Sequence, residues 1–370
     1  MCSKVRKPLQ RILMTADAIG GVWTYAIELA KEFRKRDIEV VMAVMGGISD
    51  PSLKNIVQKY DNIELIESNY KLEWMENPWD EVDKAGEWLL ELEILFNPEI
   101  VHLNGYTHAA LVWNRPVLVV AHSCVCSWFE KVKCMEIPEE YSEYKKRVIE
   151  GLACADHVVA PSCEMLMNLN KHYGPVKNST VIYNGSSSLN GLKVKKERFV
   201  LTAGRIWDEG KNIESLARIA SQLDWEVFAA GEGDVLGVKY KNFKTLGKLS
   251  QSELFTYMLK APVFVLPSRY EPFGLSILEA ARAGCALVLG DIPSLREIWE
   301  KDAVFVDPRD DGQIKTAIQD LISNESLRTE FGMRAKKRAQ KYSAEKMACN
   351  YLKIYDSLLC QKATRETFKR

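Results

Sequence analysis

The sequence predicts an α/β protein with two domains, each built on a parallel β-sheet. From residue 11 onward, short runs rich in β-branched residues alternate with longer segments of helical period, which is typical of parallel sheets covered by helices. A chain of 370 residues, 47% hydrophobic and 27% charged, is too long for one ordinary core and has the composition of a soluble globular protein. Since a polar stretch separates two alternating series of similar length, we expect two Rossmann-like domains facing each other across a cleft.

The first domain is expected to span residues 1–186. Its strand candidates are the apolar runs 12–15, 38–44, 63–66, 100–103, 117–121, 157–160 and 181–183. Between the first two runs, apolar residues at spacings of three and four predict one face of a helix: Trp23, Ala26, Ile27, Leu29, Ala30 and Phe33. Because this helix starts just after Gly20 and Gly21, a glycine turn is predicted to open it.

The second domain is expected to span residues 187–343. A hinge over 184–196 is predicted from its Gly, Ser and Lys content. Strand candidates follow at 199–203, 226–230, 243–246, 263–266, 286–289 and 304–306, with helices between them. The tail, 344–370, contains an amphipathic pattern over 344–359, and we expect this helix to pack back on the first domain.

Charge and hydropathy bear on location and partners. The 50 basic and 50 acidic side chains cancel, so nucleic acid is not expected as a partner. The apolar run 12–14 is far shorter than that of a signal peptide, and no apolar stretch approaches the roughly 20 residues that cross a bilayer. We expect a cytoplasmic protein, with peripheral contact to the cytoplasmic face of a membrane left open. The nine cysteines form no C-x-x-C pair, and most are interpreted as buried thiols, such as Cys154, Cys285 and Cys349.

The most informative segment, 267–281, combines a strand end, a loop with Pro and Gly, and a helix. Glu271 precedes this helix and Glu279 lies about two turns into it, so the two carboxylates can hold different parts of one long ligand. Backbone amides at the start of the helix lack partners within it and suit a diphosphate or sugar hydroxyls. These amides belong to Phe273, Gly274 and Leu275. Two ordinary surface glutamates are the alternative interpretation.

In this setting the two glutamates resemble the E-x7-E motif of the retaining glycosyltransferases of the GT-B fold, family 4, also called glycosyl transferases group 1. The resemblance extends through residues 287–298 and, more loosely, over nearly the whole chain. It implies that Glu271 holds hydroxyls of the transferred sugar and that Glu279 holds the nucleotide ribose. It also implies that nearby backbone amides complete the donor site.

A second group of polar residues, 203–212, follows a strand and precedes a helix. Arg205 and Lys211 within it can converge on one anion. When a sugar–phosphate bond breaks, negative charge grows on the departing nucleoside diphosphate, and fixed cations can replace a metal there. The chain has no Asp-x-Asp pair, which metal-dependent transferases usually display, so no metal or cofactor is expected. A solvated basic loop that caps a helix is the alternative.

The first domain supplies candidates for the acceptor side. His122 follows a strand candidate, and the resemblance implies that it touches the transferred sugar, although a lone histidine at a strand end is more often structural. Gly20 and Gly21 resemble the glycine-rich loop of the family, whose amides approach the donor phosphate and the acceptor. At another strand end, Asn104 and Tyr106, together with His102, are expected to line the acceptor pocket.

Two further segments complete the set of candidates. Gly231 and Gly233 follow a strand, but with Gly237 their spacing is wrong for a dinucleotide fingerprint, which argues against a nicotinamide enzyme. The resemblance implies that this turn borders the nucleotide, and backbone groups around Leu246 are expected to meet the base. No role can be derived from the sequence for segment 72–80, which contains two tryptophans. We favour a packed loop over stacking of these tryptophans on an acceptor ring.

The residues and the resemblance together predict transfer of a hexose from a nucleoside diphosphate sugar, such as a UDP or GDP sugar, to an acceptor hydroxyl. Retention at the anomeric carbon follows from the resemblance alone. The expected acceptor is a sugar, a lipid-linked molecule or another small molecule bound by the first domain. Alternatives on the same fold are a nucleotide-sugar epimerase, a glycogen-type phosphorylase and a non-catalytic subunit that binds a nucleotide sugar.

Overall fold

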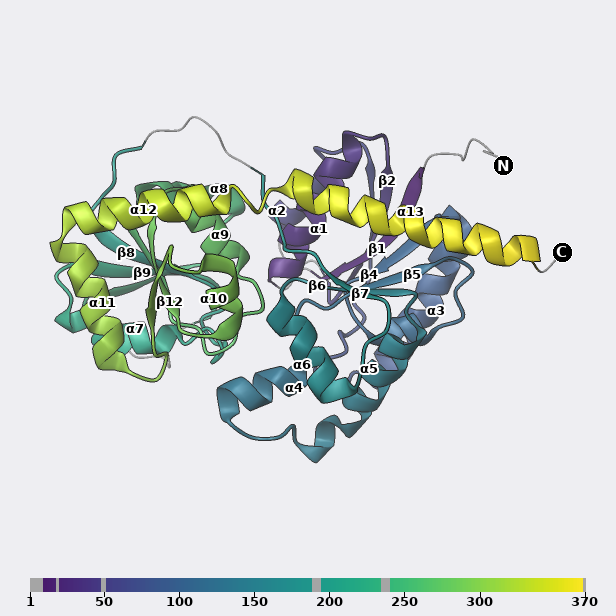
Figure 1. Ribbon diagram of the computed structural model, residues 1–370, viewed down its shortest axis with the longest axis horizontal. Helices are drawn as coiled ribbons and strands as arrows, with labels where there is room; N and C mark the ends of the chain where they lie inside the picture. The colour runs from purple at the N-terminus through teal and green to yellow at the C-terminus, as the bar shows by residue number, and fades with distance from the viewer. Residues whose placement is uncertain (1–8, 18–19, 48–50, 188–193, 234–239, 369–370) are drawn as a thin grey trace.

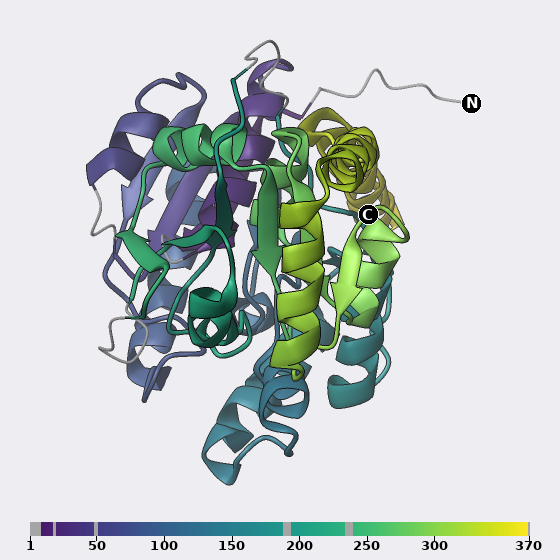
Figure 2. The same cartoon turned by 90° about the vertical axis from the view of Figure 1, so that its left-hand side faces the viewer.

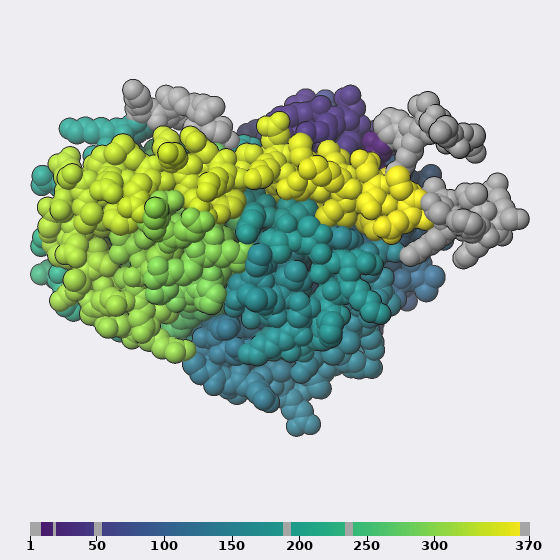
Figure 3. Space-filling view, in the orientation of Figure 1, coloured from purple at the N-terminus to yellow at the C-terminus, as the bar shows by residue number. Residues whose placement is uncertain are grey.

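The computed structural model describes residues 9–17, 20–47, 51–187, 194–233 and 240–368. Two α/β domains lie side by side, and the C-terminal segment crosses from the second domain back over the first (Figure 1). Figure 3 shows this segment in yellow along one side of both domains. The predicted fold class, α/β with two Rossmann-like domains, is confirmed.

The first domain contains a seven-stranded sheet in the order β3-β2-β1-β4-β5-β6-β7, and every neighbouring pair is parallel. Its strands are β1 (Arg11–Asp17), β2 (Glu39–Met45), β3 (Ile63–Glu67), β4 (Ile100–Leu103), β5 (Val117–Val120), β6 (His157–Ala160) and β7 (Ser179–Val181). They correspond to the seven predicted runs, with shifted ends. Strand β1 is buried on both faces from Ile12 to Ala16, as a central parallel strand requires.

Helices and short helical turns connect the strands of the first domain. They are α1 (Gly21–Arg34), α2 (Pro51–Val57), α3 (Trp79–Phe96), η1 (Thr107–Ala110), α4 (Val125–Trp128), η2 (Phe129–Lys133), η3 (Glu139–Tyr141), α5 (Ser142–Cys154) and α6 (Cys163–Tyr173). Helix α1 begins directly after Gly20, whose φ of 104° lies in the region that favours glycine. The predicted glycine turn therefore opens this helix.

The second domain contains a six-stranded parallel sheet in the order β10-β9-β8-β11-β12-β13. Its strands are β8 (Phe199–Ala203), β9 (Glu226–Ala230), β10 (Phe243–Gly247), β11 (Val263–Leu266), β12 (Ala286–Gly290) and β13 (Val304–Val306). Its helices are α7 (Ile213–Ile219), η4 (Ala220–Gln222), α8 (Gln251–Lys260), α9 (Leu275–Arg282), α10 (Pro293–Trp299), α11 (Asp311–Ser323) and α12 (Glu325–Ala339). Figure 2 turns this domain toward the viewer.

In each sheet, the order in which successive strands are added reverses at the first strand of the domain. In the second domain, β9 and β10 lie on one side of β8, whereas β11, β12 and β13 lie on the other. In the first domain, β1 separates β2 from β4 in the same way. Ligands of such sheets bind beyond the carboxyl ends of the strands at these points, so the loops after β1, β4, β8 and β11 are the natural place for a site.

Helix α13 (Ala344–Phe368) packs on the first domain, next to α1. Met347, Tyr351 and Tyr355 are buried in the same core cluster as Tyr25 and Phe33 of α1. The helix is longer than the pattern over 344–359 predicted. None of the helices in the described part of the chain is long and apolar enough to cross a membrane.

The interpretation of most cysteines as buried thiols is wrong for several of them. Cys285 is buried, but Cys154 is exposed and Cys349 is half-buried. Cys154 is the last residue of α5, whose buried face is formed by Tyr144, Val148 and neighbouring residues at helical spacing. Position 154 falls outside that face, so the apolar neighbours in the sequence do not bury its thiol.

Candidate functional site

The loop between β11 and α9 carries the first glutamate of the predicted motif. Glu271 is buried, and Gly274 has a φ of 88°, with its hypothetical Cβ only 2.6 Å from Cδ1 of Ile277, so this position requires glycine. The first hydrogen bond of α9 runs from the Leu278 N–H to the Gly274 carbonyl oxygen. The N–H groups at the start of the helix, including that of Leu275, therefore have no acceptor within it and are available to an anion or a hydroxyl.

The predicted cations and carboxylate meet at this point. Nζ of Lys211, after β8, donates to Oε2 of Glu271, after β11, across 2.6 Å. Arg205 pairs with Asp208 at 2.7 Å on the same β8 loop. Burial alone would raise the pKa of the Asp208 carboxyl, but the charges of Arg205 and Lys211 outweigh burial and lower this pKa. Both cations therefore act on one small region.

The glycine turn of the first domain lies against these residues. A Cβ atom added to Gly20 would come within 3.1 Å of a guanidinium nitrogen of Arg205. One added to Gly21 would lie 3.7 Å from Cδ1 of Leu275. The start of α1 thus faces both the β8 loop and the start of α9 across the domain boundary.

Glu279 lies one turn into α9 and not about two turns as expected, because the helix begins only at Leu275, and its carboxyl faces α1. Burial raises the pKa of its carboxyl to about 7, and the negative charge of Glu28 on α1 adds to this increase. Glu28 is itself buried and pairs with Lys31 at 2.6 Å. The two glutamates of the motif therefore differ: Glu271 has a cationic partner, whereas Glu279 loses and gains its proton near neutral pH.

The Gly231 turn packs directly on the β8 loop. A Cβ at Gly231 would lie 1.8 Å from the carbonyl oxygen of Gly204, next to Arg205, so only glycine fits. Gly233 lies against Trp207. Leu246 is half-buried against the core of this domain. Gly237 lies outside the described residues.

On the first-domain side, His122 is fixed by hydrogen bonds. Its Nε2 lies 2.8 Å from Oδ1 of Asn104, and Nδ2 of Asn104 donates to the carbonyl oxygen of Thr15 across 2.6 Å. Because Asn104 uses its amide N–H on Thr15, its oxygen accepts from His122, which places the imidazole proton on Nε2. Burial lowers the pKa of His122 to about 3, so the ring is neutral. The ring of Tyr25 packs edge-on, with the centroids 4.5 Å apart.

Tyr106 and His102 do not line an open pocket as expected. Tyr106 is 3% exposed, and its hydroxyl donates to the Ser123 carbonyl oxygen across 2.6 Å. His102 is fully buried between the hydroxyls of Tyr25 and Tyr355. His102 lies within β4 and Tyr106 in the loop after it, and the polar atoms of both side chains are used inside the domain.

Segment 72–80, whose role could not be derived from sequence, organises the loop after β4. The carboxylate of Glu73 accepts hydrogen bonds from the N–H groups of Tyr106 at 3.1 Å and Thr107 at 2.9 Å. It thereby satisfies the donors at the start of η1. Trp79 packs in the core and stacks on Arg147, whereas Trp74 is 39% exposed.

Sequence reasoning also missed a contact that joins the domains at the cation site. Nε1 of Trp128, on α4, donates to Oδ1 of Asp208 across 3.2 Å. The same oxygen accepts from the Gly210 N–H at 2.9 Å, while Oδ2 holds Arg205. Asp208 belongs to the predicted cluster 203–212, but its contact with Trp128, 80 positions away, could not be predicted from neighbouring residues.

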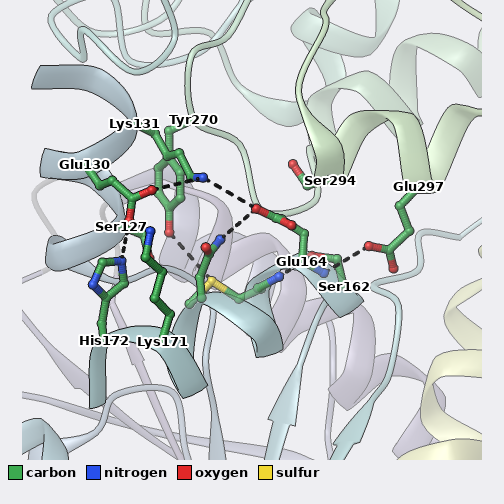
Figure 4. Close-up of polar contacts among 12 residues, drawn as sticks. Ser127, Glu130, Lys131, Ser162, Glu164, Lys171, His172, Tyr270, Ser294 and Glu297 are labelled. Carbon is green, nitrogen blue, oxygen red and sulfur yellow. Dashed lines mark hydrogen bonds and ion pairs between the residues drawn. The ribbon is translucent and has the colours of Figure 1, made fainter. Parts of the chain in front are cut away.

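A second interdomain contact lies at the start of α6. The carboxylate of Glu297 on α10 accepts from the N–H groups of Cys163 at 2.7 Å and Glu164 at 3.1 Å (Figure 4). A carboxylate at a helix N-terminus is stabilised by the unpaired donors and by the helix dipole. Nearby, the Tyr270 hydroxyl accepts from the Cys124 N–H at 3.1 Å. The loop that carries Glu271 is thus held by both domains.

The side chains that usually hold metal ions are scattered over the described ranges. No group of three His, Cys, Asp or Glu residues within these ranges lies close enough together to hold a metal ion. Metal independence of the reaction stays a prediction.

Comparison with known proteins defines the class of this two-domain fold. The chain matches the model of Glycosyltransferase Family 4 over residues 19–186 and that of Glycosyl transferases group 1 over residues 189–338. Together the two matches cover most of the chain, which belongs to the group 1, family 4 glycosyltransferases of the GT-B fold.

Curated relatives cover only part of the chain. An uncharacterized glycosyltransferase of Methanocaldococcus jannaschii is 31% identical over 176 residues, which are 43% of this chain and 45% of the relative. The O-antigen chain mannosyltransferase RfbU of Salmonella typhimurium is 28% identical over 181 residues, which are 45% and 50% of the two chains. The chain thus spans about half the length of these relatives.

Solved structures of similar shape extend over almost the whole chain. Sucrose-phosphate synthase from Thermosynechococcus elongatus has a TM-score of 0.75 at 18% identity and covers 95% of this chain and 100% of that chain. Anabaena HepE in complex with UDP and glucose has a TM-score of 0.72 at 16% identity, with 94% and 100% covered. At such identities the similarity establishes the fold alone.

Proposed function

We propose that this glycosyltransferase moves a hexose from a nucleoside diphosphate sugar to an acceptor hydroxyl, with retention and without a metal ion. The observation that carries the proposal is the 2.6 Å contact between Lys211 and Glu271 beside Arg205 and the glycine turn. It places cations suited to a diphosphate next to a carboxylate suited to sugar hydroxyls. The UDP complexes of HepE support a nucleotide donor of this kind.

Each residue has a distinct task in this proposal. Arg205 and Lys211 stabilise the negative charge that develops on the leaving diphosphate. Glu271 and the amides at the start of α9 hold hydroxyls of the sugar, and Glu279 accepts hydrogen bonds from the ribose. His122, neutral and oriented by Asn104, donates or accepts hydrogen bonds at the sugar without contributing charge.

In the proposed transfer step, the acceptor hydroxyl itself attacks the sugar, so no protein nucleophile is needed. The acceptor oxygen bonds to the anomeric carbon as the bond from that carbon to the phosphate oxygen breaks. The hydroxyl proton passes to the leaving phosphate on the same face, which gives retention. The products are the glycosylated acceptor and a nucleoside diphosphate.

The acceptor is proposed to bind between the glycine turn and the Asn104–His122 pair of the first domain. One relative, of Campylobacter jejuni, carries a diphospho-undecaprenol-linked acceptor in its name. This supports a lipid-linked sugar among the acceptor classes to be tested, with the protein at the cytoplasmic face of a membrane. Free sugars and other small molecules with a hydroxyl form the second group of acceptors.

The first experiment is a thermal-shift screen in EDTA with UDP, GDP, ADP and their glucose, mannose and N-acetylglucosamine conjugates. We expect one diphosphate series to raise the melting temperature. The selected donor is then incubated with candidate acceptors, and products are identified by mass spectrometry and NMR of the anomeric configuration. A product of altered sugar configuration without acceptor would replace the proposal with an epimerase, and binding without any turnover would replace it with a silent subunit.

A further inference from the structure

A polar cavity lies between the two domains, apart from the residues assigned to the donor. It is a cavity of about 400 Å³ lined by Glu130 and Lys131 of η2 and, from the second domain, by Arg269, Asp291, Asp307 and Arg309. The second-domain residues follow β11, β12 and β13, whereas Arg205 and Gly231 follow β8 and β9 on the other side of β11. We call this cavity the β12–β13 pocket.

The carboxylates of the β12–β13 pocket already have cationic or N–H partners. Asp291 is held by Nε and a terminal nitrogen of Arg296, at 2.5 and 2.7 Å. Glu130 pairs with Lys171 at 2.7 Å and with Lys131 at 3.2 Å (Figure 4). The charges of Asp291 and Glu130 are therefore compensated, and Asp307 accepts from the backbone N–H of Arg309 at 2.9 Å. Each carboxylate keeps lone pairs that can accept further hydrogen bonds.

The two arginines of the β12–β13 pocket, in contrast, lack a carboxylate partner among the described residues. Among the described residues, no carboxylate lies within 4.0 Å of the guanidinium nitrogens of Arg269 or Arg309. Nε of Arg269 is buried without a hydrogen-bond partner in this part of the chain, and one terminal nitrogen of Arg309 contacts the sulfur of Cys134, at 2.8 Å. Two guanidinium groups without a carboxylate partner at one cavity leave positive charge that an anionic ligand can neutralise.

We propose that the β12–β13 pocket binds a phosphorylated sugar or polyol, with its phosphate on Arg269 and Arg309. Guanidinium groups match phosphate oxygens in a bidentate geometry. The rim carboxylates of Asp291 and Asp307 can accept hydrogen bonds from the hydroxyls of the same molecule. The volume lies within the range of small-molecule sites and exceeds what an inorganic phosphate fills.

The position of the pocket gives the ligand a structural role. Its walls come from both domains, so an occupant bridges them. Arg269 also lies two residues before Glu271, and its N–H donates to the Gly210 carbonyl oxygen at 2.9 Å. The ligand therefore contacts the loop that carries Glu271, and this loop is hydrogen-bonded to the predicted cluster 203–212. Binding in this pocket does not depend on the proposed transfer reaction, because other side chains form it.

The test is isothermal titration calorimetry of the full chain with glucose 6-phosphate, inorganic phosphate and glucose in separate experiments. We expect glucose 6-phosphate to bind more tightly than inorganic phosphate and glucose not to bind. Arg269→Ala and Arg309→Ala should each weaken glucose 6-phosphate binding about tenfold or more, since each removes a charge-assisted contact. Arg269→Lys, which keeps the charge but loses the fork, should fall between the wild type and Arg269→Ala.

Two control variants distinguish binding in the β12–β13 pocket from binding elsewhere on the protein. Arg205→Ala removes a donor-site cation and Arg34→Ala removes an exposed arginine of the first domain, so both should bind glucose 6-phosphate normally. Circular dichroism and thermal unfolding show whether each variant is folded. The proposal is overturned if folded Arg269→Ala and Arg309→Ala bind like the wild type, if Arg205→Ala loses binding to the same extent, or if neither phosphate compound binds.

Discussion

Nζ of Lys211 and Oε2 of Glu271 lie 2.6 Å apart, although the two residues belong to different loops and are 60 positions apart in the chain. Their side chains are 18% and 9% exposed, so the pair is shielded from water. Because β8 and β11 are parallel neighbours in the sheet, the loops after them meet at the point where the strand order reverses. The lysine, proposed to face the diphosphate, and the glutamate, proposed to face the sugar hydroxyls, are thereby held together as one neutral ion pair.

Removing the cation of this unit should abolish transfer. We expect Lys211→Ala to lower kcat by about 10²–10³-fold, because a fixed charge that stabilises the leaving group is lost. Glu271 is then left buried without its partner, so a modest loss of thermal stability should accompany the change. Steady-state kinetics and thermal unfolding measure the two effects. Lys337→Ala, an exposed lysine on α12, is the matched control, and near-normal turnover of folded Lys211→Ala would contradict the site assignment.

The contact between Trp128 and Asp208 should connect domain closure to the donor cations. Trp128→Phe keeps most of the aromatic ring but removes the N–H that donates to Asp208. We expect the donor KM to rise roughly fivefold, which corresponds to the loss of about 1 kcal/mol for one hydrogen bond. Asp208→Asn, which also removes the charge facing Arg205, should have the larger effect. Trp74→Phe, at an exposed position, should leave the donor KM unchanged, and an equal rise there would rule out the specific role of Trp128.

Nucleotide binding should depend on pH through Glu279. Its pKa of about 7 means that the carboxyl is largely protonated below pH 6 and ionised above pH 8. Since the ionised form is the better acceptor for ribose hydroxyls, nucleotide affinity should fall as the pH is lowered from 8 to 6. Calorimetric titrations across this range, with Glu279→Gln as comparison, test the effect. A pH profile identical in Glu279→Gln would assign the dependence to another group.

The same raised pKa has a consequence for stability. A carboxyl whose folded-state pKa exceeds its unfolded value of about 4.3 favours folding less as the pH rises from about 4.3 to 7. Glu279→Gln should therefore raise the melting temperature at pH 8 relative to the wild type and have a smaller effect at pH 5. Thermal unfolding at the two pH values checks the sign.

Substitution of Gly231 should destabilise the second domain. Gly231→Ala combines a positive φ of 149° with a contact of 1.8 Å between the new Cβ and the Gly204 carbonyl oxygen. We expect a loss of about 3 kcal/mol in the free energy of unfolding. Gly174→Ala, with a φ of 86° and open space around the Cβ, measures the backbone cost alone, at about 1–2 kcal/mol. Urea unfolding of both variants gives the difference, and equal losses would show that the Gly204 contact relaxes freely.

The sequence by itself determined the fold. Each predicted strand run matched a strand of the described residues, and the central strands, such as β1 and β11, were the clearest because they are buried on both faces and are mostly apolar. The helix after Gly20 was predictable because burial of one face imposes a period of 3.6 residues. The polar residues after β8 and β11 were likewise visible, since strand ends and helix starts have local signatures.

Only the tertiary structure decided which polar groups meet and which face the space between the domains. Glu73 caps a loop 33 residues away, Trp128 reaches Asp208 over 80 residues, and Tyr106 points inward to Ser123. Such pairs depend on how the sheets, loops and domains pack. Burial leaves a periodic pattern in neighbouring positions of the chain, whereas a single hydrogen bond between distant residues leaves none.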